Sequence, residues 1–182
     1  MKFPATNSLY MQFDPQHKMR YPLYSWEEDQ PVIGINYYEA IIFSLWLELR
    51  LPTEKEWEKA ARGTDGRVYP WGEAMGYEKG FANTCDFMEC KTNSVSELEP
   101  GMSPYGCFDM AGNVWEWCMQ WNVSKHSTQR IVRGGSWMNY LVHAKCFFRN
   151  AFDPAERYLA VGLRCVSGSR FTEIEEEDMD ED

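Results

Sequence analysis

The stretch RLPTEKEWEKAARG, residues 50–63, carries the clearest local signals in the chain. Thr53 and Glu56 have the spacing of a capping box, in which both side chains satisfy free N–H groups at the start of a helix. Gly63 follows as a residue that readily adopts the left-handed conformation in which many helices end. The stretch therefore predicts a short helix from about residue 52 to residue 62.

Weaker signals lie on both sides of this helix. NYYEAIIFSLWLEL, residues 36–49, repeats apolar side chains at helical spacing behind an Asn that can cap, and predicts another helix. Residues 63–112 are rich in Gly, Pro, Asn and Ser and predict a loop network pinned by buried aromatic side chains. QRIVRGG (129–135) and AVGLRCV (160–166) have the composition of short strands. Two short helices, few short strands and a high loop content indicate an α+β fold.

Length and charge limit the classes of function. The 182 residues suit one domain, expected over residues 1–170, with an irregular lead-in over residues 1–30. The formal net charge is −10, and residues 171–182 are expected to form an acidic disordered tail. No basic stripe offers a surface for nucleic acid. No apolar run approaches the roughly 18 residues of a membrane span, and no signal peptide is evident, so a cytoplasmic location is the default expectation.

Five blocks of sequence resemble those of formylglycine-generating-enzyme (sulfatase-modifying factor) domains in order and approximate spacing, over about residues 31–166. The blocks are RLPTEKEWEKAARG (50–63), YPWG (69–72), YGCFDMAGNVWEW (105–117), RIVRGGSW (130–137) and GLRC (162–165). The resemblance implies a variant of the C-type lectin fold.

The same resemblance implies an activity, the copper-dependent oxidation of a substrate cysteine to formylglycine. That chemistry needs two neighbouring thiolates, because a soft Cu(I) ion prefers sulfur ligands. In the family these cysteines follow the RGGS block, but residues 136–145 contain no cysteine. Cys146 and Cys165 instead resemble a later, structural pair, and Ala61 occupies the place of one disulfide partner. A non-catalytic protein is therefore expected, with the copper enzyme as the alternative.

The segment between RGGSW and GLRC also resembles the template-derived segments of variable proteins of diversity-generating retroelements. In such proteins, randomisation of adenines turns AAC codons into NNC codons, which exclude Met, Trp, Gln, Lys and Glu. On this hypothesis Met138, Lys145 and Glu156 are fixed positions. The expected variable, ligand-binding positions all hold residues that NNC permits: Asn139, Tyr140, Leu141, Val142, His143, Ala144, Phe148, Asn150, Ala151, Phe152, Asp153, Ala155, Tyr158, Leu159 and Ala160.

Physical reasoning favours the same interpretation of residues 138–160. The segment shows neither the period of 2 nor the period of 3.6 that a packed element would show. It supplies aromatic side chains in loops, which bury much area on binding at a small cost in entropy. The expected partner is a protein or another macromolecular ligand. The alternative is that Tyr140, Phe148 and Tyr158 simply cover the core beneath a long loop.

The surrounding blocks are expected to hold the scaffold. Trp115, Trp117 and Trp137 are predicted to fill the core. Gly134 and Gly135 let the chain bend close to its neighbours. Arg133, Arg149 and Arg164 are candidates for buried ion pairs, with Glu116 as one plausible partner. The resemblance further implies a structural calcium site, unless Glu116 is instead a hydrogen-bonded core acid, with ligands at Asp109, Gly112, Val114 and Glu116.

Overall fold

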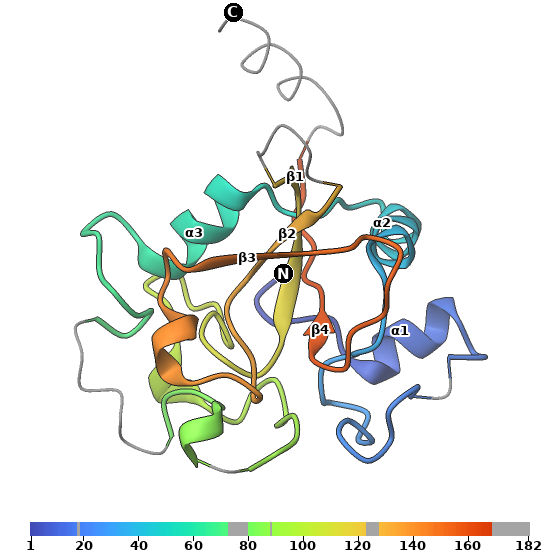
Figure 1. Ribbon diagram of the computed structural model, residues 1–182, viewed down its shortest axis with the longest axis horizontal. Helices are drawn as coiled ribbons and strands as arrows, with labels where there is room; N and C mark the ends of the chain where they lie inside the picture. The colour runs from blue at the N-terminus through green and yellow to red at the C-terminus, as the bar shows by residue number, and fades with distance from the viewer. Residues whose placement is uncertain (18, 73–79, 88, 123–127, 169–182) are drawn as a thin grey trace, which may run out of the picture.

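The computed structural model describes residues 1–17, 19–72, 80–87, 89–122 and 128–168 (Figure 1). Within these residues three α-helices and a four-stranded sheet are joined by long loops and three short 3-10 helices. The elements are α1 (Asn7–Phe13), α2 (Tyr37–Trp46), α3 (Glu54–Arg62), η1 (Cys85–Phe87), η2 (Glu99–Gly101), β1 (Trp115–Trp121), β2 (Arg130–Arg133), η3 (Leu141–Ala144), β3 (Arg149–Phe152) and β4 (Val161–Gly162).

Both predicted helices are confirmed, each with a complete capping box. In α3 the Thr53 side chain accepts the N–H of Glu56, and the Glu56 side chain accepts the N–H of Thr53. In α2 the partners are Asn36 and Glu39. Helix α2 ends earlier than predicted because Glu48, with φ of 58°, turns the chain into the left-handed region.

The lead-in over residues 1–30 is not wholly irregular, as the sequence had indicated, because it contains α1. The Thr6 hydroxyl caps this helix by accepting the N–H of Leu9. Tyr10 and Phe13 pack against Phe43 of α2, with ring centroids 5.0 and 5.6 Å away. Seven residues are too few for a clear helical period, and the packing of these rings on α2 stabilises the helix instead.

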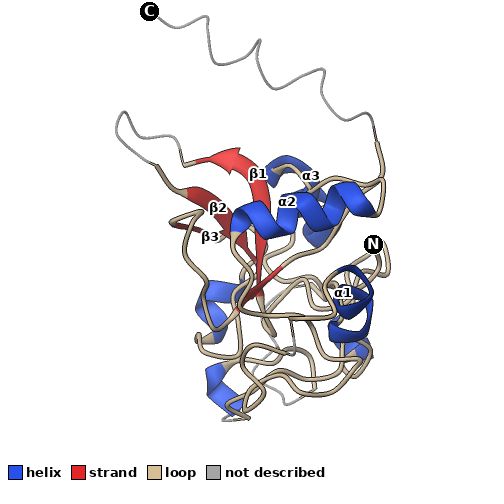
Figure 2. Ribbon diagram, turned by 90° about the vertical axis from the view of Figure 1, so that its right-hand side faces the viewer, coloured by secondary structure: helices blue, strands red, loops and turns tan. Residues whose placement is uncertain are grey.

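The strands form one mixed sheet with the order β3-β2-β1-β4. β1 pairs antiparallel with β2 and parallel with β4, and β2 pairs antiparallel with β3, which places Val132 opposite Asn150. Figure 2 shows the sheet beside α2 and α3 in one half of the molecule, with loops and short helices in the other half. β3 is an edge strand, and it crosses the face of the molecule that is turned toward the viewer in Figure 1.

The two sides of the sheet pack on different clusters. Val132 and Trp117 face the cluster built by α1 and α2, whereas Ile131 faces the cluster around Trp57 of α3. The predicted core role of the scaffold tryptophans is confirmed, since Trp115, Trp117 and Trp137 are all buried. The sheet therefore gives the segment after β2 a rigid support.

Candidate functional site

Glycines fix the two ends of the segment 138–160. The chain leaves β2 through Gly134 and Gly135, both at positive φ, where a Cβ would lie 3.2 Å from the Trp57 ring and 3.1 Å from Ala144 respectively. It returns at Gly162 of β4, where a Cβ would lie 2.5 Å from the Val32 carbonyl oxygen. A side chain at Gly162 would clash with backbone, and one at Gly134 or Gly135 would be crowded and strained by the positive φ, so the ends of the segment belong to the scaffold.

Three aromatic side chains of the segment gather over one face of the sheet. Phe148 and Phe152 lie 6.2 and 6.3 Å from the Trp115 ring, measured between centroids. Tyr158 stacks on Phe152 at 4.5 Å and also contacts the Trp117 ring at 6.4 Å. These three side chains are half-buried above buried tryptophans. We call the group formed by Phe148, Phe152, Tyr158, Asn139 and His143 the aromatic surface.

Asn139 and His143 close one side of the aromatic surface. The indole N–H of Trp115 donates to Oδ1 of Asn139 at 2.8 Å, and the Ser136 hydroxyl donates to the same oxygen at 2.7 Å. The His143 ring meets the Phe148 ring edge to face at 5.0 Å. Polar groups that can contact a ligand thus lie beside apolar rings, as in most recognition surfaces.

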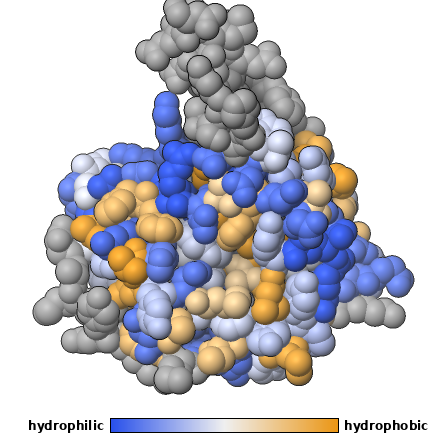
Figure 3. Space-filling model, viewed as in Figure 1, coloured by the Kyte–Doolittle hydropathy of each residue, from blue (hydrophilic) through white to orange (hydrophobic). Residues whose placement is uncertain are grey.

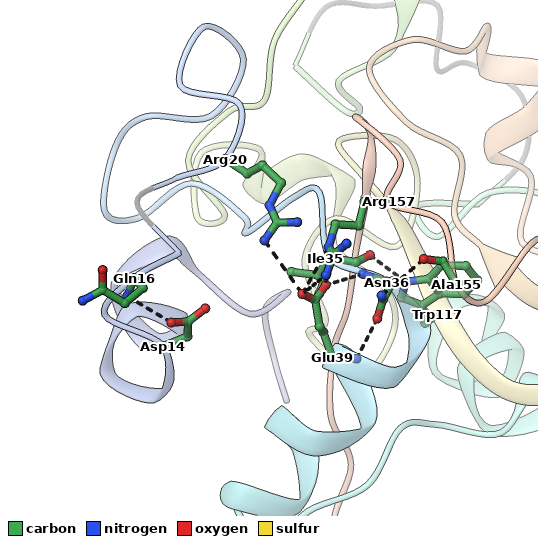
Figure 4. A network of polar contacts seen from close by, with 9 residues as sticks. All are labelled: Asp14, Gln16, Arg20, Ile35, Asn36, Glu39, Trp117, Ala155 and Arg157. Atoms are coloured by element: carbon green, nitrogen blue, oxygen red, sulfur yellow. Dashed lines mark hydrogen bonds and ion pairs between the residues drawn. The ribbon is translucent and has the colours of Figure 1, made fainter.

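The opposite side is held on the start of α2 (Figure 4). Arg157 forms a two-pronged ion pair with Glu39, at 2.7 Å between Nη2 and Oε1, and Arg20 lies 3.8 Å from the same oxygen. The Asn36 amide donates to the Ala155 carbonyl at 3.3 Å, and the N–H of Tyr37 donates to the Pro154 carbonyl at 3.1 Å. These contacts hold the loop that carries Tyr158 without using any side chain of the aromatic surface.

The expected variable positions divide by their burial. The exposed ones are Tyr140, Val142, Asn150, Asp153 and Ala155. The half-buried ones are Asn139, His143, Phe148, Ala151, Phe152, Tyr158 and Leu159. The buried ones are Leu141, Ala144 and Ala160.

The buried positions correct the expectation that the whole set forms a surface. Leu141 and Ala144 pack with Tyr69, Ala82 and Ala111, because a 3-10 helix has three residues per turn and places positions i and i+3 on one side. Val142 therefore faces outward, whereas His143 is half-buried against the Phe148 ring. Ala160 is buried where its carbonyl accepts the N–H of Trp115.

Three further residues differ from the expected division between variable surface and fixed scaffold. Ala151 packs against the cluster around Trp57, on the opposite side of the sheet from Phe152. Met138 and Phe147 are exposed, although Met138 was expected to be fixed and Phe147 was left out of the set. Both lie within turns, at residues 137–138 and 146–147, so no helical or strand period marks them.

Glu116, one of the four positions of the implied calcium site, has other partners in the structure. Both carboxylate oxygens of the fully buried Glu116 accept hydrogen bonds from Arg164, at 2.7 and 2.8 Å, and Trp57 donates to one of them at 2.6 Å. A metal ion at this carboxylate would leave the Arg164 guanidinium buried without its partner, which costs several kcal/mol. These contacts agree with the alternative role of Glu116, that of a hydrogen-bonded core acid.

Asp109 lies close to this ion pair, and its pKa is strongly raised. Its side chain accepts a hydrogen bond from the Asn113 amide at 3.1 Å. Complete burial raises the pKa of Asp109 to about 7, against opposing effects of the Asn113 hydrogen bond and of Arg164. In the described ranges, no three His, Cys, Asp or Glu side chains lie together in an arrangement suited to a metal ion.

Three of the six cysteines are packed in the core. All six are free, and Cys118, Cys146 and Cys165 are buried. Burial raises the pKa of Cys146 and of Cys165 to about 12, and raises the pKa of Cys118 well above its usual range. Cys146 packs in the same cluster as Ala61. These thiols remain protonated at neutral pH, whereas metal binding and oxidation both need the thiolate.

Two further surface features bear on partners. Among the described helices, none has the length and apolar content needed to cross a bilayer. Exposed apolar residues gather in Figure 3 over η3 and, separately, over α2.

Comparison with known proteins places this chain in a family. Residues 6–168 match the sulfatase-modifying factor enzyme 1-like domain, an extent that includes α1. The chain is 36% identical over 153 residues to the serine/threonine-protein kinase pkn1 of Chlamydia pneumoniae, covering 75% of this chain and 24% of that protein. It is 34% identical over 154 residues to inactive C-alpha-formylglycine-generating enzyme 2 of Bos taurus, covering 76% and 50%.

A third relative is the formylglycine-generating enzyme of Bos taurus, 30% identical over 166 residues that cover 76% of this chain and 44% of that enzyme. The chain thus spans half or less of the length of these relatives.

Two solved structures share the fold. Treponema denticola variable protein 1 superposes with a TM-score of 0.78 at 22% identity, covering 89% of this chain and 81% of that one. PvdO from Pseudomonas aeruginosa superposes with a TM-score of 0.73 at 20% identity, covering 89% and 77%. The chain therefore belongs to the sulfatase-modifying factor enzyme 1-like domain family and has its α+β, C-type lectin-like fold.

Proposed function

We propose that this chain is a non-catalytic ligand-binding protein, that the segment 138–160 contacts the ligand, and that a retroelement diversifies this segment. The observation that carries the proposal is the position of Phe148, Phe152 and Tyr158. Phe148 and Phe152 lie half-buried beside Trp115, and Tyr158 stacks on Phe152. All three pack against the core cluster that contains Trp115 and Trp117 and remain partly open to solvent.

Some residues hold the segment in place and others are exposed to solvent, and this separation supports a display surface. Gly134, Gly135 and Gly162 fix its ends, and Arg157 holds its second loop on Glu39 of α2. Tyr140, Val142 and Asn150 are exposed and take no part in the core clusters. Such positions tolerate exchange, because surface substitutions usually change stability by less than about 0.5 kcal/mol.

The chemistry of the surface favours a protein partner. Aromatic side chains bury large areas with few rotatable bonds, and they dominate binding energy at protein interfaces. Asn139 and His143 add polar groups at the edge of the rings. The name of the structurally similar Treponema denticola variable protein 1 agrees with this role.

The cysteines argue against the copper enzyme. Residues 136–145 contain no thiol, and the nearest one, Cys146, is buried with a raised pKa. Related proteins include both a formylglycine-generating enzyme and a form named inactive, and this chain lacks the paired thiols that the reaction requires.

Two experiments test the proposal. The first titrates the reduced protein with Cu(I) and incubates it with a sulfatase-motif peptide, using a formylglycine-generating enzyme as the positive control. We expect neither a two-thiolate copper site nor formylglycine, and formation of the product would establish the enzyme instead. The second sequences the DNA around the gene, where we expect a reverse transcriptase gene and an adenine-rich near-copy of the codons for residues 133–165; their absence would contradict diversification.

A further inference from the structure

Asn139 is held by its surroundings at every polar atom except one. Its side-chain oxygen accepts two hydrogen bonds, from the indole N–H of Trp115 at 2.8 Å and from the Ser136 hydroxyl at 2.7 Å. Its backbone N–H donates to the Ser136 carbonyl, and its own carbonyl accepts the N–H of Cys85, each at 2.9 Å. Trp115, Ser136 and Cys85 all lie outside the positions that were expected to vary. Residues of the scaffold therefore fix Asn139 in place.

The same contacts fix the direction of the side-chain amide. An indole nitrogen can only donate, so the atom of Asn139 that faces Trp115 has to be the oxygen. Two donors fill both lone pairs of that oxygen. Among the residues that the structure describes, none accepts a hydrogen bond from the NH2 group, and this group is not enclosed by the protein. The side chain thus offers a ligand two N–H donors and no acceptor.

Few residues could replace Asn139 and keep these contacts. Trp115 is only 4% exposed, so removal of the acceptor would leave a largely buried N–H unpaired. Among the other residues that NNC codons encode, only aspartate has an oxygen at the same place on the side chain. Exchange to Asp keeps the contacts to Trp115 and Ser136 but turns the outward donor into a second acceptor. Asn139 was expected to vary, whereas its contacts are those of a fixed residue.

The free NH2 group belongs to a residue at the edge of the aromatic surface. Asn139 contacts the same Trp115 ring that Phe148 and Phe152 approach. A fixed residue at this place has to suit every ligand that the varied positions select. The hydrogen-bond acceptor that all proteins share is the backbone carbonyl oxygen. We infer, on the basis of the proposed function, that Asn139 is a fixed donor to a backbone carbonyl of the protein ligand, while its varied neighbours decide which protein is bound.

Substitutions of Asn139 separate a role in the scaffold from a role in binding. Asn139→Asp should melt within about 2 °C of the wild type, since both scaffold donors keep their acceptor. Asn139→Leu should melt markedly lower, because it leaves the Trp115 N–H unpaired. Toward a ligand both variants should bind at least about tenfold more weakly, because neither offers an N–H donor. If Asn139 served only the scaffold, Asn139→Asp would bind as the wild type does.

Selection supplies the ligands for this test. A library carries NNC codons at Asn139, Tyr140, Val142 and Tyr158, is displayed and sorted for folded protein, and is then panned separately on lysozyme and on serum albumin. Asn and Asp have one NNC codon each, so the folded pool should hold both at position 139 in similar numbers and be depleted of other residues. Among binders to either protein, Asn should exceed Asp by at least about tenfold.

Individual binders then receive Asn139→Asp, with Gln16→Glu as the control that makes the same exchange at an exposed residue outside the segment. The first change should lower the affinity at least about tenfold, and the second should leave it unchanged. Equal numbers of Asn and Asp among the binders would overturn the ligand contact, and free exchange of residue 139 in the folded pool would overturn the scaffold contact. A folded library without any binder would contradict the proposed function itself and, with it, this inference.

Discussion

Substitution of neighbouring residues in η3 tests how the segment 138–160 divides between scaffold and surface. Leu141 is 1% exposed and packs with Tyr69, Ala82 and Ala111, whereas Val142 is 46% exposed. Leu141→Ala removes a buried side chain and leaves a cavity, so we expect it to lower the free energy of unfolding by about 2–5 kcal/mol. Val142→Ala and Tyr140→Ala should each lower it by less than about 0.5 kcal/mol.

The two classes separate clearly in a thermal melt. For a domain of this size about 1 kcal/mol corresponds to roughly 2–4 °C in Tm, so Leu141→Ala should melt at least about 4 °C below the wild type. Urea titration supplies the free energies and shows from an unchanged m-value that unfolding stays two-state. Equal losses for Leu141→Ala and Val142→Ala would refute the assignment of inner and outer sides to η3.

Three further predictions concern the scaffold. Raising the pH from about 4 to 7 should destabilise the wild type more than Asp109→Asn, by up to about 4 kcal/mol. The reason is that burial raises the pKa of Asp109 from 3.8 to about 7, so the folded state keeps a proton that the unfolded state releases. Urea titrations at a series of pH values measure this difference. Parallel pH profiles would show that Asp109 titrates normally. Glu48→Gly should stabilise the protein by about 1 kcal/mol in urea titration, since Glu48 is held at φ of 58°. Calcium added after chelation should leave Tm unchanged, because Arg164 already occupies the Glu116 carboxylate.

Local signals in the sequence account for the parts of the fold that were predicted. The capping boxes at Thr53 and Asn36 act within four residues, so the helices they start were readable directly. The strand β1 was not, because WEWCMQW is buried on both sides through its first half and shows no alternation. Helix α1 depends on packing against Phe43, a contact between segments far apart in the chain.

The candidate site shows the same limit. A codon pattern identifies which residues are permitted at a position, but Leu141 and Val142 are permitted equally while only one of them is exposed. Their burial follows from the three-residue turn of η3, which no helical or strand period in the sequence indicates. The ion-pair partners of the arginines could not be predicted from the sequence either. Arg164 pairs with Glu116, which lies 48 positions away, and Arg133 and Arg149 pair with acidic residues of α3. The lack of the paired copper cysteines, in contrast, needs no structure to be seen.

Selection from two matched libraries tests most directly whether the segment 138–160 forms a variable ligand surface. One library carries NNC codons at Tyr140, Val142, Asn150 and Tyr158, and the other carries them at four exposed residues elsewhere: Leu23, Trp26, Ser96 and Tyr105. Both are displayed, sorted for folded protein and panned against the same set of unrelated proteins. We predict that the first library yields folded binders with different specificities and the second yields none. A first library that is equally well folded but gives no more binders than the second would contradict the proposed function.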